Sequence, residues 1–252
     1  NSGGSYHSAY DSYEYYVRFG DPGFAYGEAL AKVAGRVTLR LANADVLPFR
    51  YTAFADNVSG YVDEVVNLAD TRRKAVALER SLIADGAYDL SADPTKPWVT
   101  PEAPEPVPHL NFAPLLNARK ALNAAAADLE KALADGGGMA AASGATAASG
   151  SMPATAATPA AVATSTELNE VLYQLERAMT REAGLPKRPW FRHQIYAPGY
   201  YTGYGVKTLP AIREAIEQGE WDTVDGHIAD VSETLHRVTR HLRQATELAR
   251  TP

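Results

Sequence analysis

Apolar residues recur at intervals of three and four positions in several long segments, and this periodicity restricts the chain to a mainly α fold. The segment nearest the C-terminus is the clearest example. Its apolar residues are Ile228, Val231, Leu235, Val238, Leu242 and Ala245. This spacing places all of them on one face of an α-helix, and such a seam is typical of antiparallel helix packing. Patterns that indicate strands are nearly absent.

Two more apolar stripes with the same spacing predict helices in the first third of the chain. One consists of Leu30, Val33, Ala34, Val37 and Leu41; the other consists of Phe54, Val58, Tyr61, Val65 and Leu68. The first stripe ends at the break Val46 to Phe49, and the second extends toward Arg72-Arg73-Lys74. A short helix from Ser8 to Phe19 precedes them, because Gly20 and Pro22 are stop signals. The second stripe needs a partner helix.

Cap and turn residues delimit the helices that follow. A helix from about Phe112 to Ala134 has Pro114 in its first turn, where the missing N–H is harmless. Thr164 to Glu167 forms a capping box, which predicts that the next helix begins there. Thr208-Leu209-Pro210 begins a short helix that ends at Gly219.

Two segments predict insertions rather than core elements. Six prolines between positions 86 and 108 forbid a continuous helix and indicate an extended surface segment. Positions 136–163 are almost wholly Gly, Ala, Ser, Thr and Pro, which favours a linker because little apolar surface offsets the entropy of ordering. We assign no function to this linker.

Composition excludes some classes of function. The formal charge of −6 and pI near 5.5 give no basic face for nucleic acid, so we expect no nucleic-acid partner. The chain has no cysteine, so any metal must be held by His, Asp or Glu. No run approaches the roughly 18 to 20 apolar residues of a membrane span.

Tyr6-His7-Ser8 is the segment most suggestive of chemistry, and an aromatic and acidic run from Tyr10 to Tyr16 follows it. A lone histidine is more often structural than a ligand, and a tyrosine is often a packed aromatic. We predict structural roles, and no metal binding, for the other four histidines considered: His193, His227, His236 and His241. Because the chain opens with Asn1-Ser2-Gly3-Gly4 rather than Met, we expect it to be the C-terminal part of a larger protein.

The residues around His7 resemble a segment of a known peptidase family. Tyr6-His7-Ser8, with Tyr10, Asp11, Tyr13, Glu14, Phe19 and Asp21-Pro22, resembles a segment of the glutamate carboxypeptidase II family. These are co-catalytic zinc peptidases with a transferrin-receptor-like dimerisation domain. The resemblance continues through Leu41-Ala42-Asn43-Ala44-Asp45-Val46-Leu47-Pro48-Phe49, through Leu175-Glu176-Arg177-Ala178, and through Gly184 to Pro198. It is collinear over nearly the whole chain apart from the two insertions.

The resemblance implies a division of the chain and a metal. Residues 1–44 would be the C-terminal edge of an α/β zinc peptidase domain, and residues 45–252 a helical-bundle dimerisation domain. His7 would be a terminal ligand of one of two zinc ions, and Tyr6 would face the tetrahedral intermediate. The other metal ligands and the general base would precede this sequence, so we expect the fragment alone to be inactive.

Tyr204, in Gly203-Tyr204-Gly205, matches a tyrosine that binds the C-terminal carboxylate of the substrate in that family. The sequence departs from the pattern at one position, because the member selective for C-terminal glutamate has a lysine where this chain has Gly203. We therefore expect a broader or different preference than strict C-terminal glutamate. Lys207 is the nearest candidate to replace that lysine.

Alternatives of two other kinds remain open. The protein could be a non-catalytic binding protein like transferrin receptor, which has no reason to keep a metal ligand at His7. It could also be an aminopeptidase with the same metal pair. The resemblance implies a homodimer, a peptide substrate with a free C-terminal carboxylate, and an extracytoplasmic location.

Overall fold

The computed structural model describes residues 5–44, 46–135 and 159–251. Its elements, in chain order, are α1 (Tyr13–Tyr15), the π-helix η1 (Tyr16–Gly20), α2 (Ala25–Ala42), α3 (Tyr51–Ala84), α4 (Ala87–Ser91), α5 (Ala113–Asp135), α7 (Pro159–Ala178), β1 (Tyr196–Pro198), β2 (Val206–Thr208), α8 (Pro210–Gln218) and α9 (Trp221–Arg250). The predicted mainly helical fold is confirmed.

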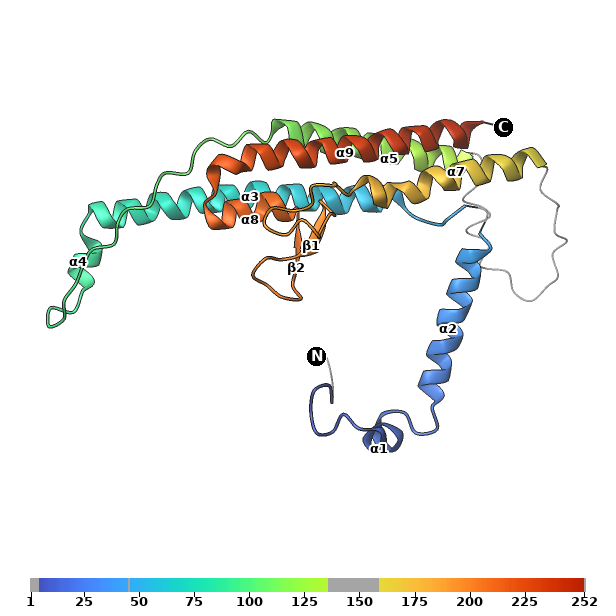
Figure 1. The fold of residues 1–252 in the computed structure, drawn as a ribbon, viewed down its shortest axis with the longest axis horizontal. Coiled ribbons are helices and arrows are strands. Elements are labelled where there is room, and N and C mark those ends of the chain that lie inside the picture. The colour runs from blue at the N-terminus through green and yellow to red at the C-terminus, as the bar shows by residue number, and fades with distance from the viewer. Residues whose placement is uncertain (1–4, 45, 136–158, 252) are drawn as a thin grey trace.

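A bundle of long helices forms the body of the molecule, and in Figure 1 α3, α5 and α9 run along its length. α5 packs most extensively on α9, while α7 and α8 also pack on α9 and α3 packs on α5 and α8. The residues of the apolar seam in α9 are all buried, from Ile228 to Ala245. The partner that the apolar face of α3 requires is therefore supplied by α5 and α8.

Polar groups buried in α9 are satisfied within the helix. The hydroxyls of Ser232, Thr239 and Thr246 donate to the carbonyl oxygens of Ile228, Leu235 and Leu242, at 2.6, 2.8 and 2.8 Å. Each bond spans four residues back along the helix, so these side chains lie in the core without an unpaired donor.

α2 differs from every long helix of the bundle, because none of its residues is buried. Its apolar stripe exists as predicted, yet Leu30 is 70% exposed and Val33 is 58% exposed. In Figure 1 the helix stands away from the bundle, joined to it by the segment before α3. Helical periodicity thus predicted the element correctly, while no described part of the chain covers its apolar face.

Several predicted boundaries are wrong. The helix predicted from Ser8 begins only at Tyr13, because the hydroxyl of Ser12 accepts a hydrogen bond from the Tyr15 N–H and caps the helix there. The helix predicted from the capping box at Thr164 begins at Pro159 instead, and proline is favoured at such a first position. Residues 159–163 of the predicted linker therefore belong to α7, while positions 136–158 lie outside the described residues.

The prolines between 86 and 108 have the predicted effect. After the short helix α4, residues 92–112 contain no helix or strand. Asp89 organises the start of this segment by accepting hydrogen bonds from Trp98 Nε1, at 3.0 Å, and from the Thr100 hydroxyl. In Figure 1, α4 and the end of α3 extend beyond the other helices.

Candidate active site segments

Tyr6 and His7 lie together on an exposed turn. The Ser8 N–H and hydroxyl both donate to the carbonyl oxygen of Ser5, at 3.0 and 2.6 Å. His7 has a φ of +57°, a left-handed conformation in which histidine is enriched among residues other than glycine. The two rings stack with centroids 4.0 Å apart, and Tyr6 is 71% exposed. Neither side chain lies in the hydrophobic core of the described residues, and the Tyr6 ring packs on the ring of His7.

Asp21 fixes the chain between this turn and α2. Its carboxylate accepts hydrogen bonds from the N–H groups of Tyr26 and Gly27, at 3.0 and 2.7 Å, and from the Tyr16 hydroxyl at 3.2 Å. Burial alone would raise the pKa of the Asp21 carboxyl, but these hydrogen bonds outweigh it and lower the pKa. A charged carboxylate at the start of α2 satisfies N–H groups that have no partner within the helix.

Tyr204 lies on the loop of a two-stranded antiparallel hairpin. β1 and β2 pair Tyr196 with Thr208, Ala197 with Lys207 and Pro198 with Val206. The loop closes through the Gly199 N–H, which donates to the Gly205 carbonyl at 2.9 Å. The Tyr204 side chain is fully exposed and has no hydrogen bond to any described residue.

Gly203, immediately before Tyr204, has a φ of +57°. A Cβ atom added there meets nothing within 4 Å, so the site has room for a side chain. The left-handed backbone is nevertheless unfavourable for other residues. The position at which this chain departs from the glutamate-selective pattern is therefore one where glycine suits the backbone.

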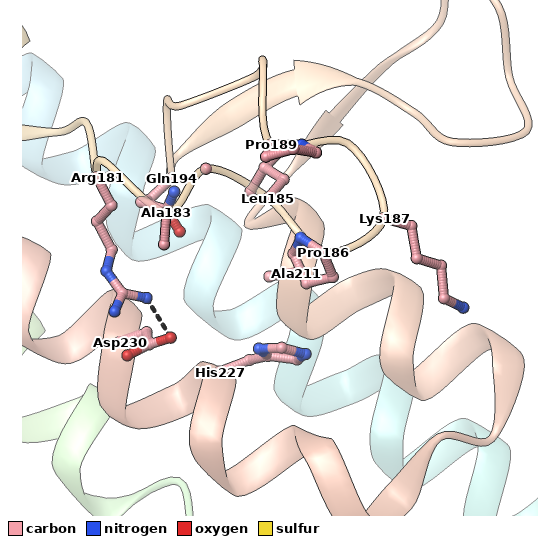
Figure 2. A pocket seen from close by; sticks show the side chains of 11 residues that line it. Arg181, Ala183, Leu185, Pro186, Lys187, Pro189, Gln194, Ala211, His227 and Asp230 are labelled. Atoms are coloured by element: carbon pink, nitrogen blue, oxygen red, sulfur yellow. Dashed lines mark ion pairs between the residues drawn. The ribbon is translucent and has the colours of Figure 1, made fainter.

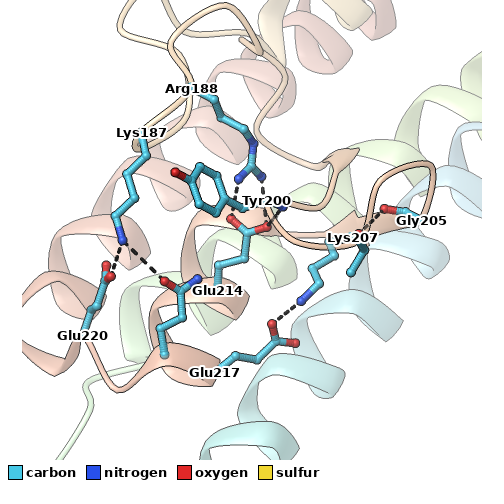
Figure 3. A network of polar contacts seen from close by, with 10 residues as sticks. Lys187, Arg188, Tyr200, Gly205, Lys207, Glu214, Glu217 and Glu220 are labelled. Carbon is cyan, nitrogen blue, oxygen red and sulfur yellow. Dashed lines mark hydrogen bonds and ion pairs between the residues drawn. The ribbon is translucent and has the colours of Figure 1, made fainter.

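A buried ion pair contacts the loop at Tyr200, as Figure 3 shows. The Arg188 guanidinium donates to both carboxylate oxygens of Glu214, at 2.8 and 3.0 Å. Their side chains are only 3% and 11% exposed. The Glu214 Oε1 atom also accepts a hydrogen bond from the Tyr200 N–H at 2.8 Å, so this pair is tied to the first residues of the loop.

The lysines near the loop are engaged by carboxylates. Lys207, on β2, forms an ion pair with Glu217 on α8. Lys187 forms an ion pair with Glu220, which raises the pKa of its ammonium group. Lys207 is thus directed toward α8 in this structure rather than held free beside Tyr204 (Figure 3).

The turn that carries Arg188 requires a glycine at its start. Gly184 has a φ of +67°, and a Cβ atom there would lie 2.1 Å from the carbonyl oxygen of Pro189. The Leu185 N–H donates to the Phe191 carbonyl at 2.8 Å, which closes the turn. Only glycine fits this close approach, so Gly184 holds the shape of the segment between α7 and β1.

A shallow cavity of about 410 Å³ lies beside this turn, and Figure 2 shows its lining. Arg181 and Asp230, which both line it, form an ion pair. Burial lowers the pKa of His227, on α9, against the opposing effect of the Asp230 and Glu220 carboxylates. The surroundings of His227 in this lining fit a structural role.

His193 has the structural role that its position predicted. Its Nδ1 atom accepts hydrogen bonds from the N–H groups of Ile195 and Tyr196, both at 3.2 Å. Its Nε2 atom lies 3.2 Å from Glu176 Oε1. Burial lowers the pKa of His193, and the Glu176 carboxylate acts in the opposite direction.

The predicted site residues are not brought into one constellation. In the described part of the chain, no hydrogen bond, ion pair or ring contact joins Tyr204 with Tyr6 or His7. Likewise, no group of three or more His, Asp or Glu side chains among the described residues is placed to hold a metal ion. His7 alone does not make a zinc site, since a structural or catalytic zinc takes at least three protein ligands. None of the described helices has the length and apolar character to cross a membrane.

Sequence reasoning missed three residues that organise these segments: Asp21, Arg188 and Glu214. Asp21 had a weak signal, because a negative charge near a helix N-terminus is favourable, although Phe24 and not Asp21 is the N-cap residue of α2. Arg188 and Glu214 had none, since they lie 26 residues apart and only the fold brings them together.

Comparison with known proteins is consistent with this architecture. Residues 110–243, more than half of the chain, match the transferrin receptor-like dimerisation domain family. A relative from Arabidopsis thaliana, named "Probable glutamate carboxypeptidase LAMP1", is 27% identical over 243 residues, which are 96% of this chain and 27% of that protein. The "Probable glutamate carboxypeptidase" of Arthroderma benhamiae is 23% identical over 232 residues, 92% of this chain and 25% of that protein.

A rat protein named "Aminopeptidase NAALADL1" is 22% identical over 252 residues, 97% of this chain and 27% of that protein. The chain therefore spans about a quarter of the length of the curated relatives it matches. Because the family match covers the bundle helices from α5 into α9, the chain belongs to the transferrin receptor-like dimerisation domain family.

Proposed function

We propose that the protein containing this chain is a peptidase of the glutamate carboxypeptidase type that hydrolyses peptide bonds next to a free C-terminal carboxylate. The observation that carries the proposal is that His7 and Tyr204, which the resemblance places in a peptidase site, are both exposed, and that neither side chain forms a hydrogen bond or ion pair with a described residue. The names of the relatives add support at the level of peptidase activity.

The proposed roles follow the chemistry of each side chain. Tyr204, a neutral phenol donor, binds the terminal carboxylate of the substrate. Tyr6 donates a hydrogen bond where negative charge develops on the reacting carbonyl. His7 supplies one imidazole to a pair of zinc ions, and the remaining ligands come from elsewhere in the protein.

The division of the chain is part of the same proposal. Residues 1–44 form the edge of the peptidase domain, and the exposed apolar stripe of α2 packs on the rest of that domain in the same protein. The cost of leaving such a stripe in water supports this arrangement. Residues 45–252 form the dimerisation domain of a homodimer. The resemblance also favours an extracytoplasmic location.

A matched set of variants at Gly203 tests the specificity of this site in the full-length protein. Gly203→Lys restores the cation of the glutamate-selective pattern in open space, and Gly203→Ala imposes the same left-handed backbone strain without the charge. Because one charge-assisted hydrogen bond is worth about 1.5 to 3 kcal/mol, Gly203→Lys should raise the preference for C-terminal glutamate over alanine at least about tenfold. Gly203→Ala should leave the preference unchanged.

Two outcomes would contradict the proposed peptidase function. One is a wild-type protein, loaded with zinc, that cleaves no peptide with a free C-terminus, which would favour a receptor-like binding protein. The other is cleavage that follows a free N-terminus and ignores the C-terminus, which would favour the aminopeptidase alternative that the rat relative represents. Zinc content that His7→Ala does not change would remove His7 from the metal site.

A further inference from the structure

The loop that carries Tyr204 is attached to α8 on both of its sides. On the first side, the Tyr200 N–H donates to Glu214 Oε1 at 2.8 Å. On the second side, Lys207 forms its ion pair with Glu217. Figure 3 shows both contacts, at Glu214 and at Glu217. The backbone of the loop is therefore held in place while the Tyr204 side chain projects freely.

Glu214 is itself held rigidly. Both of its carboxylate oxygens accept hydrogen bonds from Arg188, and the Arg188 guanidinium carbon lies 5.6 Å from the centre of the Tyr200 ring. The Arg188 side chain thus contacts Tyr200 through its ring, while Glu214 contacts the same residue through its backbone. Two elements that are 26 residues apart converge on one loop residue.

A buried ion pair is weak evidence for a contribution to stability. Burying two charges costs several kcal/mol of desolvation, and apolar residues of similar volume are often as stabilising. The Arg188 Nε atom is buried without a hydrogen-bond partner among the described residues, which adds to the cost. What an apolar pair could not supply is an acceptor for the Tyr200 N–H.

We propose that Arg188 and Glu214 are positioning residues that fix the loop from Gly199 to Gly205 in the geometry in which Tyr204 meets the substrate carboxylate. This inference rests on the proposed peptidase function. A loop that is already ordered loses little entropy when substrate binds, so Tyr204 forms its hydrogen bond at a lower cost. Loss of the support should therefore weaken substrate binding and leave the chemical step nearly unchanged.

The test uses the full-length protein with the double substitution Arg188→Met and Glu214→Leu. This variant removes both charges, keeps similar volume and leaves the Tyr200 N–H without an acceptor. We expect faster amide hydrogen exchange in residues 199–205 with exchange in α8 and α9 unchanged. We also expect KM to rise about fivefold, the equivalent of one neutral hydrogen bond, with kcat changed less than twofold. Asp63→Asn, which breaks an exposed pair with Arg119 between α3 and α5, is the control and should change neither quantity.

A positioning role also predicts dependence on Tyr204. In a Tyr204→Phe background the double substitution should cause no further rise in KM, because the group being positioned is gone. An additive rise would overturn the proposal, as would unchanged exchange in the loop or faster exchange spread through the helices. If the double variant does not fold, Glu214→Gln takes its place under the same criteria; its single amide oxygen cannot accept all three of these hydrogen bonds, so the expected effect is smaller. If the wild type cleaves no peptide, the proposed function fails, and the exchange of the loop still decides whether Arg188 and Glu214 anchor it.

Discussion

Tyr204→Phe separates the proposed role in binding from any role in folding. The substitution removes one hydroxyl from a side chain that is fully exposed and makes no hydrogen bond to a described residue. An exposed group without partners contributes little to stability, so the free energy of unfolding should change by less than about 0.5 kcal/mol. A loss of activity in this variant would therefore reflect the substrate and not the fold.

The expected kinetic effect follows from the charge of the partner. A hydrogen bond to a charged group is worth about 1.5 to 3 kcal/mol, which corresponds to a fall in kcat/KM of roughly 10-fold to 150-fold. The assay compares peptides that end in a free carboxylate with the same peptides carrying a C-terminal amide. The wild type should prefer the carboxylate, and Tyr204→Phe should lose most of that preference.

Tyr201→Phe is the matched control, because Tyr201 lies on the same loop and is 74% exposed. It should retain the preference of the wild type for the free carboxylate. Equal losses in both variants would mean that the loop responds to any change of surface, and unchanged kinetics in Tyr204→Phe would exclude Tyr204 from the site. Either result refutes the proposed role of this hydroxyl.

Three further outcomes are expected. Tyr51→Phe removes a buried hydroxyl that has no hydrogen-bond partner among the described residues; its burial raises the pKa of Tyr51 to about 12. Thermal unfolding of this variant should show the same free energy of unfolding as the wild type or a value up to about 1 kcal/mol higher. A loss above about 1 kcal/mol would mean that the hydroxyl has a hydrogen-bond partner. Burial lowers the pKa of His227 in the folded state. His227 therefore does not reduce the free energy of unfolding above its unfolded pKa of about 6.5. As the pH falls below that value toward the folded pKa, the free energy of unfolding decreases. Denaturant titrations at pH 8 and pH 5 should show a smaller difference for His227→Gln than for the wild type, and an equal difference would remove His227 as a cause. The full-length protein should sediment as a dimer at micromolar concentration, and a monomer would count against the proposed homodimer.

The positions of most helices were predictable because their signals are local. An apolar residue at every third or fourth position, as in the run from Ile228 to Ala245, can form a continuous face only on a helix. Pro210 and Gly219 bracket α8 as predicted, since proline suits a first turn and Gly219 adopts the left-handed cap, with a φ of +72°. The start of α7 was predicted less well, because two local signals compete there: the capping box at Thr164 to Glu167 and Pro159, where the helix begins.

Burial was not predictable from the same pattern. The stripe of α9 and the stripe of α2 have the same spacing, yet Leu235 is fully buried and Leu30 is largely exposed. Periodicity establishes that a helix has an apolar face, but it contains no information about which other segment covers that face.

The residues of the candidate site were predictable from the sequence, but their supporting contacts were not. The sequence by itself predicted which side chains carry the chemistry, His7, Tyr6 and Tyr204, through a local motif and a resemblance. Only the tertiary structure decided that Tyr204 stands on a loop supported by Arg188 and Glu214. That support depends on hydrogen bonds shorter than 3.1 Å between segments 26 residues apart, and such contacts arise only after the turn at Gly184 and the helix α8 have packed together.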